Sequence, residues 1–310
     1  MRAFALACLL SLAACGGRSE LGVPLPGDAG PDPSSCGAPW VIFTHVSDGT
    51  SQIFARRADG TDGHALALAG AQPTYPSVSP DGTTLLYAHD ATQHLSLHRF
   101  ADHTEQVLPT QGQVGRGSVS PDGSQVVYGD GNNLHLVGVS GSPAEHVLVS
   151  AALTPGNAAG FPSFTGDGQT VIYAAGGVVQ SIGADGTGAK TLLTTDTSSV
   201  EFPNPTLSPD AASVAVIASC DGPSIALRTY PLASLPTPCS SGAVVTAVTD
   251  VLSYYDPAWG PTGLIAYATG QGMLIVSASG GTPTNLTADL VGPTAGVLTP
   301  TWAPSCASLP

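Results

Sequence analysis

The sequence Pro76-Ser-Val-Ser-Pro-Asp-Gly82 recurs in altered form along the chain and indicates the fold class. Proline presets φ, aspartate hydrogen-bonds nearby backbone, and glycine tolerates a conformation that other residues avoid, so the stretch predicts a tight turn between antiparallel strands. The other copies are Gly117-Ser-Val-Ser-Pro-Asp-Gly123, Pro162-Ser-Phe-Thr-Gly-Asp-Gly168, Pro205-Thr-Leu-Ser-Pro-Asp-Ala211, Pro257-Ala-Trp-Gly-Pro-Thr-Gly263 and Pro300-Thr-Trp-Ala-Pro-Ser305.

Successive copies are 41, 45, 43, 52 and 43 residues apart. Repeats of about 40 to 50 residues with several short strands are typical of propeller blades. After most turns an apolar strand ends near a tyrosine, at Tyr87, Tyr128, Tyr173 and Tyr267, and the fourth repeat has Val216 there. A third apolar strand and a more polar fourth follow. The pattern therefore predicts an all-β, six-bladed β-propeller with four antiparallel strands in each blade.

The turn and the aromatic strand after it resemble the TolB-type, WD40-like propeller repeat over nearly all of residues 39–306. Family members usually carry tryptophan before the turn, as Trp259 and Trp302 do here. The other four copies have Val78, Val119, Phe164 and Leu207. Because the resemblance lies in the blade turns, no partner-binding residue can be transferred from the family. An unrelated β-sandwich or β-helix is the alternative fold.

The two ends of the repeat region are incomplete. The last copy, at Pro300, has only a few residues after it, whereas residues 40–43, 52–54 and 65–68 supply three strands with no turn motif before them. We therefore expect the C-terminal strand to complete a first blade with the three N-terminal strands. This closure protects both sheet edges and joins the ring.

The cysteines support this composite blade. When the repeats are aligned, Cys36 and Cys306 both fall in the one interrupted turn, which predicts a disulfide between them. Cys220 and Cys239 remain and should pair by elimination. Cys220 ends a second strand on one face and Cys239 lies in a loop that begins toward the other, but the insertion is long enough to fold back. Disulfides require an oxidising, exported compartment.

The N-terminus predicts export. Residues 1–14 have one basic residue and an apolar run of about a dozen residues, as a signal peptide requires, and the run is too short to span a bilayer. Leu12-Ala-Ala-Cys15 resembles the bacterial lipobox, which implies that Cys15 is lipidated and begins the mature protein. No Asp follows Cys15, so we expect an outer-membrane lipoprotein on the periplasmic or cell-surface side. An ordinary cleaved signal peptide is the alternative.

Composition sets the domain organisation and excludes some partners. Residues 15–38 are rich in Gly, Pro and Ser without apolar periodicity and are predicted to be a flexible tether, and residues 39–310 are predicted to be the propeller. Loss of Arg2 with the signal peptide leaves 7 basic and 22 acidic residues, a net charge of −15. This charge argues against nucleic acid and anionic lipid surfaces as partners. We expect a monomer that touches the membrane only through its anchor.

One end of the central channel is the candidate ligand-binding site, because the innermost strands of all blades begin there. The chemistry of the residues just before the motifs differs between blades and suits a polar organic ligand or a peptide. If they form a site, these side chains should be exposed, whereas packing inside the channel would explain them equally. They are Tyr75, Arg116, Phe161, Asn204, Asp256 and Thr299, with Glu201, Tyr254 and Tyr255 slightly outside.

Two other groups have plain structural explanations. His89, His94, His98 and His103 crowd one blade, but they lack cysteine or carboxylate neighbours at a ligand spacing, so we predict no metal site. Asp81, Asp122, Asp167 and Asp210 each belong to a separate turn and are expected to form those turns. No cofactor is predicted.

These observations favour a lipid-anchored binding or scaffold module of the cell envelope, with an envelope protein or glycan bound at the channel mouth. An enzyme is less favoured, because the propeller uses every residue after the tether and no Gly-x-Ser-x-Gly elbow occurs. A lyase or hydrolase acting at the channel mouth is the alternative, with Arg116 as its clear inward-pointing candidate. No catalytic residue is assigned.

Overall fold

The structure is a computed structural model that describes Cys36 to Leu309, except residues 71, 90–93, 111, 151–159, 176, 195–203, 221–223, 250–255, 293–294 and 308. The predicted signal peptide, Cys15 and residues 16–35 lie outside the described residues. Contacts divide the chain into Met1–Gly37 and Ala38–Pro310, and every described strand belongs to the second unit.

The strands of Ala38–Pro310 form six small sheets, which we number as blades 1 to 6. Blade 1 contains β25 (Ala295–Ala303), β1 (Trp40–Ser47), β2 (Thr50–Arg57) and β3 (Gly63–Ala65). Blade 2 contains β4 (Pro73–Val78), β5 (Thr84–His89), β6 (His94–Arg99) and β7 (Glu105–Val107). Blade 3 contains β8 (Gly117–Val119), β9 (Gln125–Gly129), β10 (Leu134–Gly138) and β11 (His146–Val149).

Blade 4 contains β12 (Gly160–Phe164), β13 (Thr170–Ala175), β14 (Val178–Gly183), β15 (Lys190–Thr194) and β19 (Thr237–Pro238). Blade 5 contains β16 (Thr206–Leu207), β17 (Ser213–Ser219), β18 (Ile225–Pro231) and β20 (Ala243–Ala247). Blade 6 contains β21 (Ala258–Trp259), β22 (Leu264–Thr269), β23 (Gly272–Ser277) and β24 (Thr284–Asn285). Two short 3-10 helices, η3 (Leu232–Ser234) and η4 (Cys239–Ser241), lie between β18 and β20.

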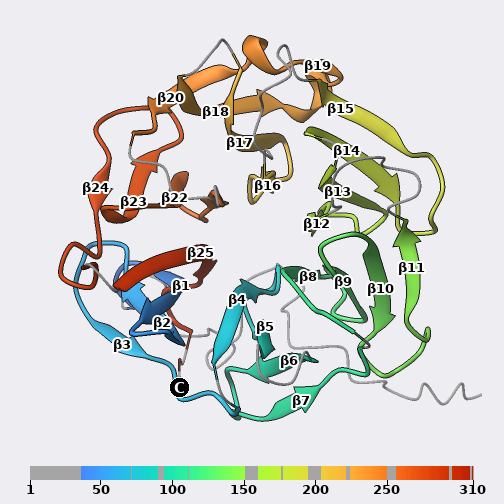
Figure 1. Ribbon diagram of the computed structural model, residues 1–310, viewed down its shortest axis with the longest axis horizontal. Coiled ribbons are helices and arrows are strands. Elements are labelled where there is room, and N and C mark those ends of the chain that lie inside the picture. The colour runs from blue at the N-terminus through green and yellow to red at the C-terminus, as the bar shows by residue number, and fades with distance from the viewer. Residues whose placement is uncertain are drawn as a thin grey trace, which may run out of the picture. The chain divides into compact units, whose positions relative to one another are not determined.

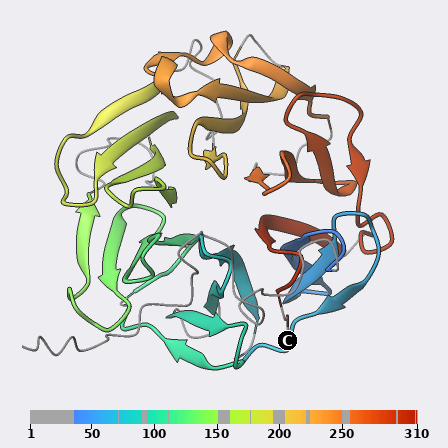
Figure 2. The same ribbon diagram turned by 180° about the vertical axis from the view of Figure 1, so that it is seen from behind.

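The six sheets stand in a ring (Figures 1 and 2), which confirms the predicted six-bladed β-propeller. The composite blade is confirmed as well, because β25 pairs antiparallel with β1. Blade 4 differs from the four-stranded expectation. The insertion of blade 5 supplies β19, which pairs parallel with the outer strand β15 of blade 4.

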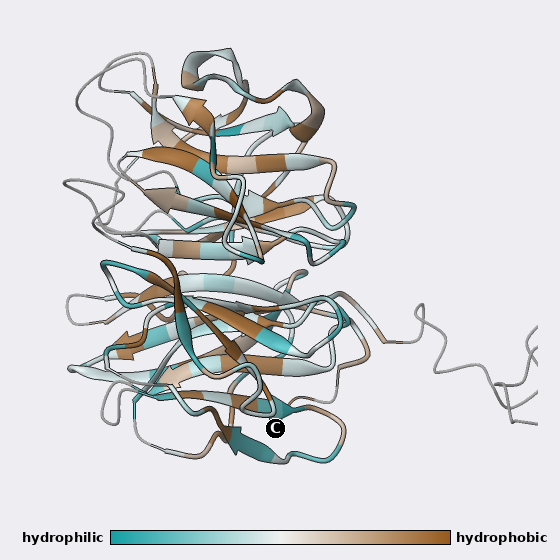
Figure 3. Cartoon of the chain, turned by 90° about the vertical axis from the view of Figure 1, so that its right-hand side faces the viewer, coloured by the Kyte–Doolittle hydropathy of each residue, from teal (hydrophilic) through white to brown (hydrophobic). Residues whose placement is uncertain are grey.

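The blades hold together through apolar side chains on their middle strands. Strands such as β5 and β13 are buried on both faces because each blade packs between two others, so they carry continuous apolar runs. Coloured by hydropathy, the strands show these hydrophobic segments within the blades (Figure 3). The expected aromatic position is fully buried in four of the repeats, at Tyr87, Tyr128, Tyr173 and Tyr267.

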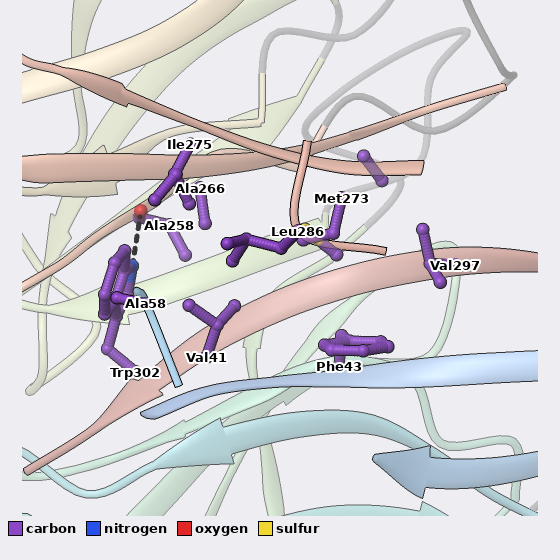
Figure 4. Packing of buried hydrophobic residues seen from close by; sticks show 11 residues of the cluster. Val41, Phe43, Ala58, Ala258, Ala266, Met273, Ile275, Leu286, Val297 and Trp302 are labelled. Atoms are coloured by element: carbon purple, nitrogen blue, oxygen red, sulfur yellow. Dashed lines mark hydrogen bonds between the residues drawn. The ribbon is translucent and has the colours of Figure 1, made fainter. Parts of the chain in front are cut away.

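The contact between blades 6 and 1 shows how the C-terminal strand closes the ring (Figure 4). Trp302 of β25 packs in a cluster that includes Val41 of β1 and Ile275 of β23. Its indole Nε1–H donates to the backbone oxygen of Ala258 at 2.9 Å. The tryptophan therefore fills the space between the blades while its polar atom remains hydrogen-bonded, as a buried indole requires.

The repeated turn has the same hydrogen bonds in blades 2 to 5. In blade 2 the hydroxyl of Ser79 donates to Asp81 Oδ1 at 2.6 Å, and the backbone N–H of Thr83 donates to the same oxygen at 3.1 Å. The Ser79 hydroxyl also accepts from the N–H of Thr84 at 3.0 Å. Gly82 has φ +71°, a left-handed conformation that glycine adopts without a steric penalty. The predicted role of these aspartates as turn formers agrees with this geometry.

Both predicted disulfides agree with the structure. Cys220 and Cys239 are joined, with their Cα atoms 5.4 Å apart, so the insertion does fold back toward the end of β17. Cys36 and Cys306 are also disulfide-bonded, in agreement with the predicted pairing. In the part of the chain that the structure describes, no helix has the length and apolar character needed to cross a membrane.

Candidate functional site

The central channel contains a cavity of about 330 Å³ lined by the inner strands of all six blades. We call the end where the inner strands begin the mouth end, and the end where they run into the repeated turns the turn end. Arg116 lines the cavity near the mouth end. A ring of prolines lines the turn end, at Pro80, Pro121, Pro209, Pro261 and Pro304. The inner strands also contribute hydroxyl groups, at Ser77, Ser118, Ser163, Thr206 and Thr301.

Three of the predicted mouth residues lie in irregular backbone at the same point of their blades. Tyr75, Phe161 and Thr299 have φ angles of +53°, +55° and +47°, and each precedes a proline. The strand pairing shifts register at each of these points, as a β-bulge does. Bulges re-aim side chains, and that of Phe161 reaches the channel cavity. Apart from the proline, no residue pattern along the chain indicates these bulges.

The structure brings together three predicted residues from different blades. Asn204, just before β16, donates from Nδ2 to Asp256 Oδ1, just before β21. Arg116, just before β8 on the opposite side of the ring (Figure 1), has Nη1 3.6 Å from Asp256 Oδ2. Its Nη2 donates to the backbone oxygen of Pro300 at 3.2 Å. One polar network therefore links blades 1, 3, 5 and 6.

Two acceptor oxygens in this network lack a hydrogen bond. Asp256 Oδ2 and Asn204 Oδ1 are both buried and have no donor within the described structure. The ion pair to Arg116 does not supply one, because 3.6 Å is too long for a hydrogen bond. Buried polar atoms without partners are rare, and each calls for an explanation such as a water molecule or a ligand.

Burial raises the pKa of Asp256, while the charge of Arg116 and the hydrogen bond from Asn204 act to lower it. The carboxyl group is 0% exposed, so the loss of hydration outweighs the two favourable contacts. The exposure that a site would require is therefore absent at Asp256, and equally at Asn204 and Thr299, which are 4% and 3% exposed, as the packing alternative implies. The inner strands start deeper in the channel than the sequence indicates, since neighbouring blades cover their first residues.

The remaining mouth residues have different positions. Arg116 is partly exposed, with 16% of its side chain accessible. Tyr75 packs against the apolar core between blades 2 and 3. Glu201, Tyr254 and Tyr255 lie outside the described residues.

The histidines of blade 2 act as separate hydrogen-bonding groups. His98 Nδ1 lies 2.9 Å from Glu105 Oε1, and His89 Nε2 lies 2.8 Å from the hydroxyl of Ser96. His94 is exposed. Among the described residues, no three His, Cys, Asp or Glu side chains are grouped so that they could hold a metal ion.

A second cavity, of about 860 Å³, lies between blades 4 and 5 and was not predicted from the sequence. Its lining includes Gly166, which replaces the proline of the repeated turn, and Ser181, which lies on β14. The 52-residue spacing of the fourth repeat was the available signal, because the insertion that lengthens this repeat forms one wall.

No known protein-family profile matches the sequence. No curated protein matches it either. Solved structures do match the fold. TolB from Acinetobacter baumannii is similar at 17% identity and a TM-score of 0.67, over 86% of this chain and 67% of that one. The putative TolB from Agrobacterium tumefaciens is similar at 16% identity and a TM-score of 0.58, over 81% and 89%.

A chain of a nidogen/laminin complex is similar at 9% identity and a TM-score of 0.66, over 86% of this chain and 99% of that one. At these identities the likeness concerns the fold and not the activity. The likeness to the two TolB structures agrees with the repeat, the closed ring and the composite first blade. Residues 38–310 therefore have the fold of a TolB-type six-bladed β-propeller.

Proposed function

We propose that the protein is an exported scaffold of the cell envelope, anchored through a lipid on Cys15, that binds another envelope protein at the mouth end of its channel. The observation that carries the proposal is the polar network of Arg116, Asn204 and Asp256. It joins side chains from three blades at one end of the channel and leaves two buried acceptor oxygens without donors. A donor group of a partner would satisfy them.

Export is supported by the cysteines. The Cys220–Cys239 bond and the disulfides of Cys36 and Cys306 need an oxidising compartment. A lipid anchor at Cys15, followed by a tether to residue 38, would hold the propeller near the membrane and raise its effective concentration beside other envelope proteins.

A protein partner is favoured over a glycan for two reasons. One propeller of the same fold comes from a complex between two proteins, nidogen and laminin. The mature chain also carries a predicted net charge of −15, which would steer a basic protein surface toward it. An envelope glycan remains an outcome that the binding experiment can reveal.

The test compares the parent with an Arg116→Gln, Asp256→Asn double variant. Both charges are removed together because one charge left alone in the network would destabilise the fold. Purified protein is cross-linked in an envelope extract, the partner is identified by mass spectrometry, and its affinity is then measured with purified components. We expect the double variant to bind at least tenfold more weakly, the order of effect for about 1.4 kcal/mol.

An Asp122→Asn variant is the matched control, because Asp122 lies in an exposed turn at the other end of the channel. It should bind as the parent does. A double variant that retains its melting temperature and its full affinity places the binding site elsewhere on the propeller. Binding to a glycan array that is lost when Arg116 is replaced would show that the ligand is a glycan and not a protein.

The anchor is tested with Cys15→Ser. If Cys15 is lipidated, the variant should move from the membrane fraction to the soluble fraction, since one acyl-modified residue is the proposed attachment. The parent and the variant are compared by fractionation and by labelling with a radioactive fatty acid. A variant that remains as membrane-bound as the parent contradicts the lipid anchor and leaves the channel proposal to its own test.

A further inference from the structure

The cavity between blades 4 and 5, which we call the seam pocket, has the size of a ligand site and does not depend on the channel proposal. Its volume of about 860 Å³ lies within the range of about 300–1,000 Å³ that is usual for small-molecule pockets. It opens beside the repeated turns. Thr165, Gly166 and Ala211 line both the seam pocket and the channel cavity, so the two adjoin at the turn end.

Three departures from the repeat coincide in the seam pocket. Gly166 occupies the turn position that is proline in every other copy, so the rim lacks a pyrrolidine ring at this position. Ser181 is paired with Ile172, whereas the equivalent residues of blades 2 and 3 are Leu97 and Leu136. The third departure is the insertion of residues 231–242 in blade 5. The pocket exists because two side chains are smaller here and an extra segment covers the gap.

The walls of the pocket are apolar and held in place. Ile172 and Leu192 come from blade 4, and Leu232 and Leu235 come from the insertion. The insertion is held at its far end by the Cys220–Cys239 disulfide and by the pairing of β19 with β15. A preformed apolar wall gains affinity because little ordering is needed when a ligand binds.

The two turns on the rim each leave one carboxylate oxygen free. In blades 2 and 3, Thr83 and Ser124 donate a hydroxyl to Oδ2 of Asp81 and Asp122. The corresponding residues on the rim are Gln169 and Ala212, which have no hydroxyl group, and the side-chain amide of Gln169 donates to the backbone oxygen of Asp167.

Asp167 and Asp210 therefore accept only at Oδ1, from a hydroxyl and a backbone N–H each, and their Oδ2 atoms have no donor in the described structure. Hydrogen bonds from Thr165 and Ser208, respectively, lower the pKa of both carboxyl groups, so both are ionised at neutral pH.

The pocket is also lined by a cation, Lys190, and by the hydroxyl group of Ser181. Ser181 and Lys190 are paired residues on neighbouring strands, so their side chains lie side by side on the face that forms the pocket. Ser181 is only 8% exposed, yet its hydroxyl has no hydrogen bond within the described part of the chain. Lys190 likewise has no ion pair among the described residues. Both groups remain available to a ligand.

We propose that the seam pocket binds a short peptide with a free N-terminus and apolar side chains. Its ammonium group would contact the free oxygens of Asp167 and Asp210, and its carboxylate would contact Lys190 and the hydroxyl of Ser181. The apolar side chains would lie between Ile172 and the leucines of the insertion. A zwitterion with an apolar body matches all three features, whereas a simple anion would be repelled by the two aspartates.

The probe is trileucine, measured by isothermal titration calorimetry with the full mature protein. Trileucine amide lacks the carboxylate, N-acetyl-trileucine lacks the ammonium group, and N-acetyl-trileucine amide lacks both. We expect trileucine to bind best, each singly blocked peptide to bind at least fivefold more weakly, and the doubly blocked peptide weakest. Equal binding of all four peptides, or no binding of any, would overturn the proposal.

Variants then assign the binding to the seam pocket. Ser181→Leu restores the leucine of blades 2 and 3 and fills the pocket, so it should abolish trileucine binding. Asp210→Asn should weaken trileucine at least fivefold without changing N-acetyl-trileucine, and the matched turn variant Asp122→Asn should change neither. If Ser181→Leu does not fold, Lys190→Gln, on an exposed residue, should weaken trileucine but not its amide.

Trileucine binding that survives these pocket variants contradicts the seam site. The Arg116→Gln, Asp256→Asn double variant should bind trileucine as the parent does, because its residues do not line the seam pocket. The failure of the channel proposal would therefore leave this result unchanged. A loss of trileucine binding in that double variant would instead indicate that the peptide binds in the channel.

Discussion

The two ends of the central channel shift the pKa of an aspartate in opposite directions. At the turn end, Asp122 is exposed, and hydrogen bonds from Ser120 and Ser124, led by the Ser120 hydroxyl, lower its pKa to about 2. At the mouth end, Asp256 is buried, and burial raises its pKa despite Arg116 and Asn204. Local turn geometry thus supplies donors within two residues of Asp122. At Asp256, burial between blades removes the hydration of the carboxylate, and the contacts with Arg116 and Asn204 do not compensate fully for that loss.

Removal of the disulfide at the turn end should cause the greatest loss of stability and tests whether this bond closes the ring. A Cys36→Ser, Cys306→Ser double variant should lose about 4–5 kcal/mol of unfolding free energy, because the disulfide closes nearly the whole propeller into one loop. Urea denaturation of the parent and the variant measures the loss. A change below about 1 kcal/mol would mean that the pairing of β25 with β1 already closes the ring by itself.

The next effect concerns the packing of the turns. Gly82→Ala should destabilise the protein more than Gly123→Ala, although both glycines have φ near +70°. A Cβ atom at Gly82 would overlap with Pro304 Cγ, whereas a Cβ atom at Gly123 would meet nothing within 4 Å. We expect about 1–2 kcal/mol for Gly123→Ala, from the left-handed backbone alone, and a larger loss for Gly82→Ala.

Ala211 provides the reverse control, because it occupies the same turn position in blade 5 with φ +53°. Ala211→Gly should therefore stabilise the protein by about 0.5–1 kcal/mol. Thermal denaturation of the three variants ranks them. Equal losses for the two alanine variants would show that Pro304 moves aside easily.

A smaller effect tests the mouth end through pH. Because the folded pKa of Asp256 is raised, the unfolded chain ionises first, and the parent should lose stability as pH rises from about 4 toward the folded pKa. Asp256→Asn cannot ionise, so its stability relative to the parent should increase over that range. Denaturation at several pH values between 4 and 7 measures the trend, and a relative decrease would contradict the raised pKa.

The smallest effect has the opposite sign and tests the turn end. The lowered pKa of Asp122 contributes stability that is present above the ordinary aspartate pKa of 3.8 and is lost as pH falls through about 2. Asp122→Asn should therefore be slightly less stable than the parent at pH 5 and equal to it near pH 2. Because the group is exposed, solvent screening keeps the difference small. If the stability difference between the variant and the parent is the same at pH 5 and pH 2, it does not depend on ionisation of Asp122 and comes from the lost hydrogen bonds.

The features that depend on neighbouring residues can be predicted from the amino-acid sequence alone. The Pro-Asp-Gly turns, the buried tyrosine position and the repeat length predict six blades, because each turn is stabilised by contacts within about five residues. The interruption of the repeat also determined that β25 completes blade 1. The cysteine positions followed from the same alignment, which is why both disulfides could be paired before the fold was known.

Contacts between residues far apart in the sequence could not be predicted, because they depend on how the blades pack. Nothing near Asp256 indicates that Arg116 reaches it from the opposite blade, that neighbouring blades bury its carboxyl group, or that its Oδ2 lacks a donor. The seam pocket likewise needed the ring, because Ser181 and Leu235 become neighbours only when blades 4 and 5 pack together. Turn chemistry is short-range and repeats along the sequence, whereas burial and ion pairing depend on packing between blades.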